Sequence, residues 1–335
     1  MEPKFKTIAL FGANGQVGKA VMEALVHCKD PAFHIIAFVS PNSSFQLRSP
    51  EDDTSRVTIK RVDLSLATCD ELATILADGK ADVAISALGG QIITKQGLVQ
   101  DAAAQAGVKR FYPSEFGMHQ VVWLPDEPAY LHPIWNVKIR CFEEAIRHPA
   151  IRSGSMSYTV IGCADSYDAT KEPLFCPWLE TDTRVTQDGY TIHCVGDPDA
   201  RMDYSTLHDT TDFLVASLRH PEVSRNRYLG FRSDHISFRE VADLLRKYSG
   251  KPVRLEVTPV DQVKEIPKNP SSAPVEWCRR STFPIDFFLT LRCVQGQGVF
   301  WRPPVLLHNH LFPEAQPVTV AEYFKKLFAK GDCLH

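Results

Sequence analysis

A glycine-rich segment near the amino terminus constrains the fold of this chain more than any other feature. Residues 5–11 (FKTIALF) form a short apolar run, and Gly12, Gly15 and Gly18 follow it at the spacing G-x-x-G-x-x-G. From Val17 to Cys28, apolar residues recur at the spacing of one helix face. A strand, a tight turn and a helix in this order predict the start of a βαβ unit with a dinucleotide site. The alternative is a glycine turn that serves packing alone.

The glycines of this segment have a chemical purpose as well as a steric one. They let the backbone come close to a diphosphate, and the unpaired N–H groups at the start of the helix stabilise its negative charge. The residues that we expect to hold the diphosphate are Gly12, Ala13, Asn14, Gly15, Gln16, Val17 and Gly18.

Further apolar runs alternate with segments of helical period, which predicts buried parallel strands joined by helical crossovers. These runs span residues 33–39, 57–62, 82–87, 108–113 and 157–163, and a helix is expected over 136–147. The alternation predicts an α/β protein whose residues 1–165 form an NAD(P)-binding Rossmann fold with a doubly wound parallel sheet. Residues 166–335 are expected to form a smaller C-terminal α/β substrate lobe, interleaved with the end of the sheet.

The second half of the chain has more turn signals. The Asp188-Gly189 pair and the neighbouring prolines predict loops and a hairpin over 184–195. Helices are expected over 208–219, 237–249 and 318–330, and strands over 226–231 and 253–259. Prolines and aromatic residues dominate between 267 and 317, which favours a loop-rich cap over a pocket. The aromatic residues of that cap are Trp277, Phe283, Phe287, Phe288, Phe300 and Trp301.

Composition excludes several classes of function. The 37 basic and 40 acidic side chains give a net charge of -3, so the chain has no basic face for nucleic acid. No apolar run approaches the roughly 20 residues of a membrane span, and no secretory signal is visible. The nine cysteines show neither metal-ligand spacing nor pairing with histidines, so we expect free thiols, no metal site and a cytoplasmic location.

The end of the second predicted strand bears on the choice of cofactor. Proteins that prefer NAD(H) carry an acidic residue there for the ribose 2′-hydroxyl. This chain has Ser40 instead, with no carboxylate before Glu51, and Arg48 could supply a counter-charge for a 2′-phosphate. NADP(H) is therefore favoured over NAD(H). The alternative for Arg48 is a solvated loop arginine.

Residues at the ends of other strands are also expected to contact the cofactor. Asp63 follows the third strand and should lie beside the adenine, although it could instead cap a helix that starts near Thr68. The end of the fourth strand (SALGGQ) should pass the ribose and nicotinamide, through Ser86, Ala87, Leu88 and Gln91.

The catalytic motif of tyrosine-dependent short-chain reductases is absent from the expected place. The helix after the fifth strand has no Tyr-x-x-x-Lys, and the one match in the chain, Tyr167 to Lys171, follows the sixth strand and meets Pro173. We interpret it as a chance match. The expected helix carries instead the sequence NVKIRCFEE (136–144), preceded by RFYPSEFG (110–117).

These two segments, with the glycine loop, the SALGGQ stretch and residues 203–217 (DYSTLHDTTDFLVAS), resemble the isoflavone reductase and phenylcoumaran benzylic ether reductase family, NmrA-like atypical short-chain dehydrogenases. The resemblance covers roughly residues 5–260, and the loop composition is closer to fungal than to plant members. It implies an NADPH-dependent reductase with Lys138 as the catalytic group, which is also expected to contact the cofactor. A desolvated ammonium beside a nicotinamide has a lowered pKa and can transfer a proton. The alternatives are a lysine that only holds the ribose, or an exposed helix residue.

Several neighbours of Lys138 are expected in the same crevice. Ser114, Glu115 and Phe116 end the fifth strand, and Glu115 could equally be structural. The sixth strand ends at Gly162 and Cys163, which should line the nicotinamide. His132 could be a second acid or base, although a structural role is the more common one for such a histidine.

Two departures from the family pattern affect what the resemblance implies. Plant members carry an arginine after the second strand, where this chain has Ser40-Pro41, and the segment after the sixth strand differs from theirs. We therefore expect an NADPH-dependent oxidoreductase of secondary metabolism that reduces an apolar aromatic or polyketide-like small molecule. The alternatives are a dinucleotide-sensing regulator without turnover, and a non-redox isomerase or dehydratase. The oligomeric state, a homodimer included, stays open.

Overall fold

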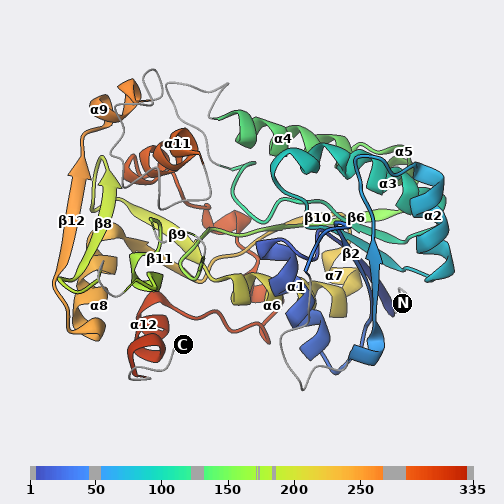
Figure 1. Ribbon diagram of the computed structural model, residues 1–335, viewed down its shortest axis with the longest axis horizontal. Coiled ribbons are helices and arrows are strands. Elements are labelled where there is room, and N and C mark those ends of the chain that lie inside the picture. The colour runs from blue at the N-terminus through green and yellow to red at the C-terminus, as the bar shows by residue number, and fades with distance from the viewer. Residues whose placement is uncertain are drawn as a thin grey trace.

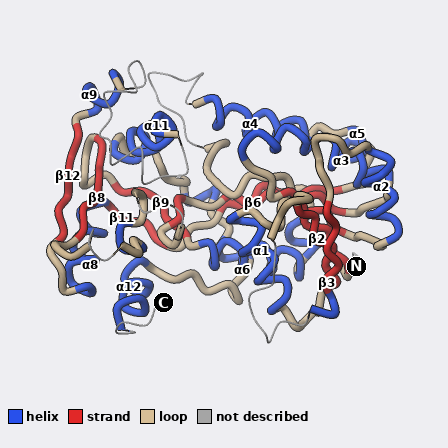
Figure 2. Tube along the Cα trace, viewed as in Figure 1, coloured by secondary structure: helices blue, strands red, loops and turns tan. Residues whose placement is uncertain are grey.

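The chain folds into two lobes that lie side by side (Figure 1). The computed structural model describes residues 5–44, 54–121, 132–170, 172, 174–182, 186–266 and 284–329. The N-terminal lobe contains the large sheet, and the second lobe contains two smaller sheets with helices around them (Figure 2).

The N-terminal lobe is built on a seven-stranded sheet in the order β10-β6-β5-β4-β1-β2-β3. Every neighbouring pair in it is parallel, as the β-α-β alternation of the sequence predicts. Its strands are β1 (Thr7–Phe11), β2 (His34–Val39), β3 (Val57–Arg61), β4 (Val83–Ser86), β5 (Arg110–Tyr112), β6 (Ser157–Gly162) and β10 (Arg227–Gly230). The doubly wound fold class is confirmed.

Helices cover both faces of this sheet (Figure 1). One face is covered by α1 (Gln16–His27), α6 (Leu207–Arg219) and α7 (Pro221–Ser224). The other is covered by α2 (Cys69–Asp78), α3 (Gln96–Gln105), α4 (Pro133–Ile146) and α5 (Pro149–Arg152). Each face has its own apolar core, because side chains alternate along a strand: Ile8 and Leu10 of β1 pack toward α1, and Ala9 and Phe11 pack toward α2. Each large apolar side chain buried in this way contributes about 1.5–3 kcal/mol.

The second lobe contains two short sheets. One comprises β11 (Asp234–Ser237), β9 (Arg201–Ser205) and β7 (Asp165–Ser166), and the other pairs β12 (Val253–Thr258) with β8 (Tyr190–Val195). The helices of the lobe are α8 (Phe238–Ser249), α9 (Val260–Glu265), α11 (Ile285–Gly296) and α12 (Val320–Ala329).

The hairpin expected over 184–195 is wrong for the described residues. β8 pairs in parallel with β12, which lies about sixty residues further along the chain, with Tyr190 opposite Val253. The Asp188-Gly189 turn is present, and Gly189 N donates to the Thr186 carbonyl at 3.3 Å. The turn leads into β8 beside Pro252, since Tyr190 N donates to the Pro252 carbonyl at 2.9 Å. Residues 183–185 lie outside the described part of the chain.

The loop-rich character expected for this aromatic segment is wrong over residues 285–296, whereas residues 297–317 consist of turns, loops and two short 3₁₀ helices. Residues 285–296 form the regular helix α11, and the rings of Phe287, Phe288 and Phe300 are buried in the core of the second lobe. Trp301 is 39% exposed. Trp277 and Phe283 lie outside the described residues.

The chain returns from the second lobe to the first. After β9 it forms α6, which packs against α1, and then β10, which pairs with β6 at the edge of the large sheet. The domain boundary that the sequence suggests at residue 165 stays a prediction. The C-terminal half of the chain is interleaved with the large sheet through α6 and β10. Of the helices in the described ranges, none has the length and apolarity needed to cross a bilayer.

Candidate cofactor and active site

The glycine loop between β1 and α1 is shaped by steric needs at two of its glycines. Gly12 has a left-handed φ of +81°, and a Cβ on it would lie 2.7 Å from the Ala87 carbonyl oxygen. A Cβ on Gly18 would lie 2.0 Å from the carbonyl oxygen of Gly12. Both glycines are therefore needed to pack α1 against the ends of β1 and β4.

Gly15 has a different environment, at the N-cap of α1. Its φ of -72° is open to any residue, and the nearest atom to a Cβ there is the Gly12 carbonyl oxygen at 3.3 Å. No side chain caps α1, and its first turn has no acidic residue. The N–H groups of Gln16, Val17 and Gly18 at this end of the helix suit an anion, so the loop fits a diphosphate.

The loop after β2 lies beside the glycine loop. Asn14 Nδ2 is 3.4 Å from Ser40 Oγ, which joins the two segments. Asp63, after β3, accepts a hydrogen bond from Ser65 N at 2.9 Å and so closes its own turn. The helix-cap alternative for Asp63 is wrong, because Thr68 itself caps α2. Arg48 lies outside the described residues.

The end of β4 packs directly under the glycine loop. Ser86 is fully buried, and its Oγ has no hydrogen-bond partner in the described part of the chain. Ala87 N donates to the Phe11 carbonyl, and the Leu88 carbonyl accepts a 2.6 Å bond from Ser114 Oγ. Gln91 is an exposed residue of the short 3₁₀ helix Gly90–Lys95.

The end of β5 is held to its neighbours by backbone and side-chain bonds. Ser114 N donates to Gln96 Oε1 at 2.7 Å, and Gln96 Nε2 donates to the Cys141 carbonyl of α4. Phe116 N donates to the Ile161 carbonyl of β6 at 2.9 Å. Phe116 has a φ of 47°. This left-handed conformation is unfavourable for any residue other than glycine, and such residues occur often at functional sites.

Lys138 lies on the second turn of α4 and reaches the end of β5. Its Nζ donates a 2.9 Å hydrogen bond to the Glu115 carbonyl. Burial lowers the pKa of the ammonium, and the negative charge of Glu115 opposes this only in part. A lysine with a lowered pKa at the carboxyl end of the sheet is suited to transfer a proton.

The carboxylate of Glu115 is buried beside this lysine. Its Oε1 accepts bonds from His119 N at 2.9 Å and Nδ1 at 3.0 Å, and its Oε2 has no partner among the described residues. Burial alone would raise the pKa of Glu115, but His119 and Lys138 lower it below its ordinary value. His119 also packs edge-on against Trp135 of α4 at 5.0 Å. His119 was not predicted from the sequence, although its spacing of four residues from Glu115 is a signal for such a pair.

The end of β6 is tightly packed by residues from far along the chain. A Cβ on Gly162 would lie 2.3 Å from the Tyr228 hydroxyl and 2.8 Å from Arg302 Nη2, so this glycine is needed for packing. Burial raises the pKa of the Cys163 thiol to about 11, which keeps it protonated.

Arg302 is a fully buried arginine that was not predicted from the sequence. Its Nη2 donates to the Gly117 carbonyl at 2.6 Å and to the Cys163 carbonyl at 3.1 Å. Its Nη1 donates to the Phe231 carbonyl at 3.3 Å. One side chain thus joins the loop after β5 to the ends of β6 and β10. No sequence motif marks it.

Two other candidates have structural roles. His132 caps α4 through Nδ1, which accepts from Ile134 N at 3.2 Å, and its Nε2 lies 3.0 Å from the Asp286 carboxylate. Tyr167 is buried, and its hydroxyl donates to the Val318 carbonyl. It follows β7 and is not on a helix, so it does not form a Tyr-x-x-x-Lys site. Lys171 lies outside the described residues.

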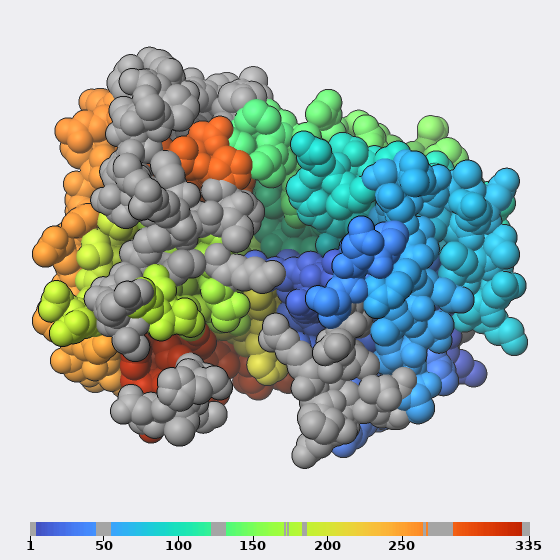
Figure 3. Space-filling model, viewed as in Figure 1, coloured from blue at the N-terminus to red at the C-terminus, as the bar shows by residue number. Residues whose placement is uncertain are grey.

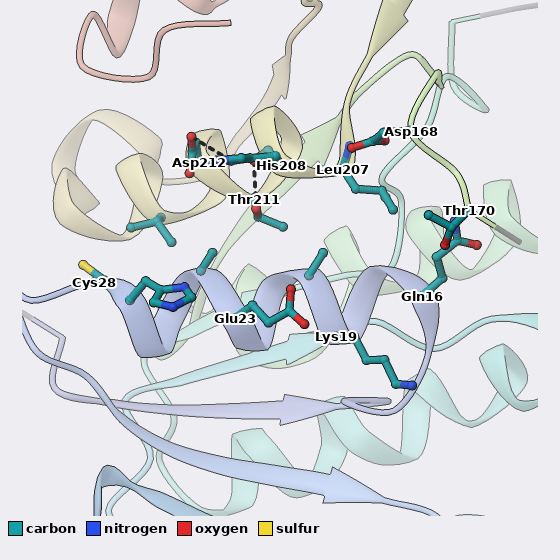
Figure 4. A pocket seen from close by; sticks show the side chains of 14 residues that line it. Gln16, Lys19, Glu23, Cys28, Asp168, Thr170, Leu207, His208, Thr211 and Asp212 are labelled. Atoms are coloured by element: carbon teal, nitrogen blue, oxygen red, sulfur yellow. Dashed lines mark hydrogen bonds and ion pairs between the residues drawn. The ribbon is translucent and has the colours of Figure 1, made fainter. Parts of the chain in front are cut away.

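The predicted site residues therefore gather at the carboxyl ends of β1, β2, β4, β5 and β6. In the space-filling view, the dark blue of the glycine-loop region reaches the surface at the centre of the molecule, where the lobes meet (Figure 3). A separate groove of about 690 Å³ runs along α1 and α6, from Gln16 to Cys28, with His208 and Asp212 on its other wall (Figure 4). Lys138 and Glu115 are not part of that groove.

Comparisons with known proteins agree with this arrangement. A model of the NmrA-like family matches residues 4–276. "Isoflavone reductase homolog IRL" of Zea mays is 28% identical over 332 residues, covering 95% of this chain and 97% of its own. "Eugenol synthase 1" of Petunia hybrida is 26% identical over 328 residues, covering 94% and 96%. A solved leucoanthocyanidin reductase–NADPH complex from Vitis vinifera has a TM-score of 0.70 at 16% identity, covering 97% of this chain and all of that one.

Proposed function

The chain belongs to the NmrA-like family, and from that premise we propose that it is an NADPH-dependent oxidoreductase of the isoflavone reductase type. The resemblance seen in the sequence is confirmed by the family match and by relatives that include a phenylcoumaran benzylic ether reductase of Nicotiana tabacum. One observation carries the proposal. A partly buried lysine with a lowered pKa is held at the end of β5, beside a loop shaped for a dinucleotide.

The residues of the chain fit NADP(H). The first turn of α1 would bind the diphosphate, and the Asn14–Ser40 pair would lie beside the adenosine ribose. Ser86 Oγ and Glu115 Oε2 are buried polar atoms without a partner in the described part of the chain. The Ser86 hydroxyl can donate or accept a hydrogen bond with a ligand, and the Glu115 carboxylate oxygen can accept one. When bound, the nicotinamide supplies the hydride. The nicotinamide complex of a solved relative supports this choice of cofactor.

Lys138 is proposed to donate the proton that accompanies the hydride. Its Nζ is fixed by the Glu115 carbonyl, so two of its three N–H bonds stay available for a substrate oxygen. The lowered pKa makes the ammonium a better acid, and the nearby Glu115 carboxylate keeps it charged before the reaction. A charged ammonium in a poorly hydrated site also stabilises an oxyanion that forms on the substrate.

The substrate class is proposed to be an apolar aromatic or polyketide-like small molecule of secondary metabolism, in the cytoplasm. Relatives and solved neighbours carry the names isoflavone reductase and phenylcoumaran benzylic ether reductase, and one neighbour was solved with pinoresinol.

The test is an assay of NADPH consumption at 340 nm with aromatic enones, carbonyls and benzylic ethers. Lys138→Met should lower turnover by roughly 10²- to 10⁴-fold, the usual cost of losing a general acid, while the protein still binds NADPH. Arg140→Gln is the matched control, since Arg140 is an exposed cation on the same helix. Normal turnover by Lys138→Met would contradict the proposed role. Tight binding of NADPH without turnover of any substrate would favour a dinucleotide sensor.

A further inference from the structure

The loop after β2 contains no cation in the part that the structure describes. Residues 40–44 read Ser-Pro-Asn-Ser-Ser. In a Rossmann fold this loop contacts the 2′ position of the adenosine ribose, where NADP(H) carries a phosphate and NAD(H) a hydroxyl. A preference for NADP(H) requires a positive charge beside this position, and none of residues 40–44 carries one.

Arg61 brings such a charge to this loop from the neighbouring strand. It is the last residue of β3 and pairs in register with Val39, the last residue of β2. Its Nη1 donates to the Ser43 carbonyl at 2.5 Å and to the Pro41 carbonyl at 3.4 Å. The guanidinium is thus held against the loop in which Ser40 stands where plant members of the family carry an arginine.

The rest of this guanidinium is free to bind an anion. Within the described residues, Arg61 has no carboxylate partner, and no bond uses its Nε or Nη2. Arg56, five residues earlier, differs: it spans Val26 and Phe33 carbonyls with both Nη atoms, at 2.7 and 2.9 Å. Arg56 is a structural link, whereas Arg61 is exposed and keeps an unused pair of N–H groups.

The remaining charges near the loop do not compete for that pair. The carboxylate of Asp63 closes its own turn with Ser65. Lys60 precedes Arg61 on the same strand, and successive side chains of a strand point to opposite faces. The polar groups on the other side of the loop, Asn14 Nδ2 and Ser40 Oγ, are neutral donors suited to phosphate oxygens.

We infer that Arg61 binds the 2′-phosphate of NADP(H) and sets the preference of this chain for NADP(H) over NAD(H). The inference rests on the proposed function, because it assumes that the glycine loop holds this dinucleotide. A planar guanidinium held through one nitrogen can offer the other edge to two phosphate oxygens. Arg61 acts on cofactor binding and takes no part in proton transfer.

The experiment measures the dissociation constants of NADPH, NADH and 2′,5′-ADP by titration calorimetry. Arg61→Gln should weaken NADPH and 2′,5′-ADP by roughly 10- to 100-fold, the range of a charge-assisted hydrogen bond, and leave NADH unchanged. Arg61→Lys, which keeps the charge without the fork, should lose part of this affinity. Lys60→Gln is the matched control for loss of one positive charge on β3 and should change none of the three. Thermal unfolding shows whether each variant is folded.

The outcomes separate this inference from the proposed function. Selective loss of the phosphorylated ligands in Arg61→Gln supports the inference. If the unmodified protein binds NADPH and NADH equally, or if Arg61→Gln keeps the full preference, Arg61 is not the determinant and the reductase proposal still stands. Loss of preference in Arg48→Gln alone overturns the inference in the same way. If the unmodified protein binds neither dinucleotide, the proposed function itself fails.

Discussion

The glycine loop allows a sharp comparison between two single-methyl substitutions three residues apart. In Gly18→Ala the new Cβ would lie 2.0 Å from the Gly12 carbonyl oxygen, 2.8 Å from its carbonyl carbon and 3.0 Å from Ala13 Cα. All three atoms belong to the backbone, and Gly12 is itself fixed against Ala87. The first turn of α1 must therefore move. In Gly15→Ala the nearest atom is 3.3 Å away, so a shift of a few tenths of an ångström suffices.

The magnitudes follow from these contacts. Overpacking of a rigid region costs about 1–3 kcal/mol, and a clash with backbone alone places Gly18→Ala at the upper end. Alanine returns at most about 1 kcal/mol in helix propensity at this position in the first turn of α1. The net loss in the free energy of unfolding is about 2 kcal/mol. For Gly15→Ala we expect less than about 1 kcal/mol, because the change there is the replacement of a glycine N-cap by a poorer one.

Urea denaturation followed by circular dichroism, together with NADPH titration, measures both effects. We expect Gly18→Ala to lose stability and NADPH binding together. Gly15→Ala should keep its stability and bind NADPH more weakly, because its methyl group narrows the approach to the N–H groups of α1. Equal stability of the two variants would refute the steric reasoning. Unchanged NADPH affinity in Gly15→Ala would refute the placement of the diphosphate.

Two further predictions concern titratable groups. The pKa of Glu115 is lowered by the fold, so its contribution to stability is present above its ordinary pKa of 4.5 and is lost as the pH falls below that value. In Glu115→Gln the free energy of unfolding should therefore fall less steeply as the pH is lowered. An unchanged pH profile of stability would argue against a charged Glu115. Asp212 raises the pKa of His208 through a hydrogen bond and through its charge, so NMR titration should show a pKa above the ordinary 6.5, and Asp212→Asn should lower it toward 6.5. Because the His208 side chain is 78% exposed, solvent screening limits the contribution of this pair to under about 1 kcal/mol. That contribution is fully present below about pH 6.5 and is lost as the pH rises through the raised pKa.

The sequence allowed the large sheet to be predicted because its strands are local signals. Apolar runs such as 33–39 and 82–87 are buried on both faces, and the observed strands β2 and β4 begin and end within one or two residues of them. The glycine loop and Lys138 were found in the same way, from spacing and a short motif. These features depend on residues that are close together in the chain.

The features that were missed depend on contacts between distant residues. The partner of β8 lies in β12, and nothing near Asp188 indicates a parallel pairing over that distance. Phe287 and Phe288 were interpreted as a pocket wall because a run rich in proline and aromatic residues hides the helical period of α11. Arg302 is not recognisable at all, since its role comes from carbonyl groups of three separate strand ends.

The position of Arg302 has a consequence for how the protein is made. During synthesis the ribosome releases the glycine loop, Glu115 and Lys138 long before residue 302. Until then the carbonyls of Gly117 and Cys163 lack the guanidinium that donates to them. The left-handed turn at Phe116 therefore lacks the hydrogen bond that holds the next residue, Gly117. The ends of β5 and β6 in the N-terminal lobe can therefore reach their final arrangement only after residue 302 has been synthesised. A chain that stops before residue 302 would contain every motif of the reductase and would lack a completed active site.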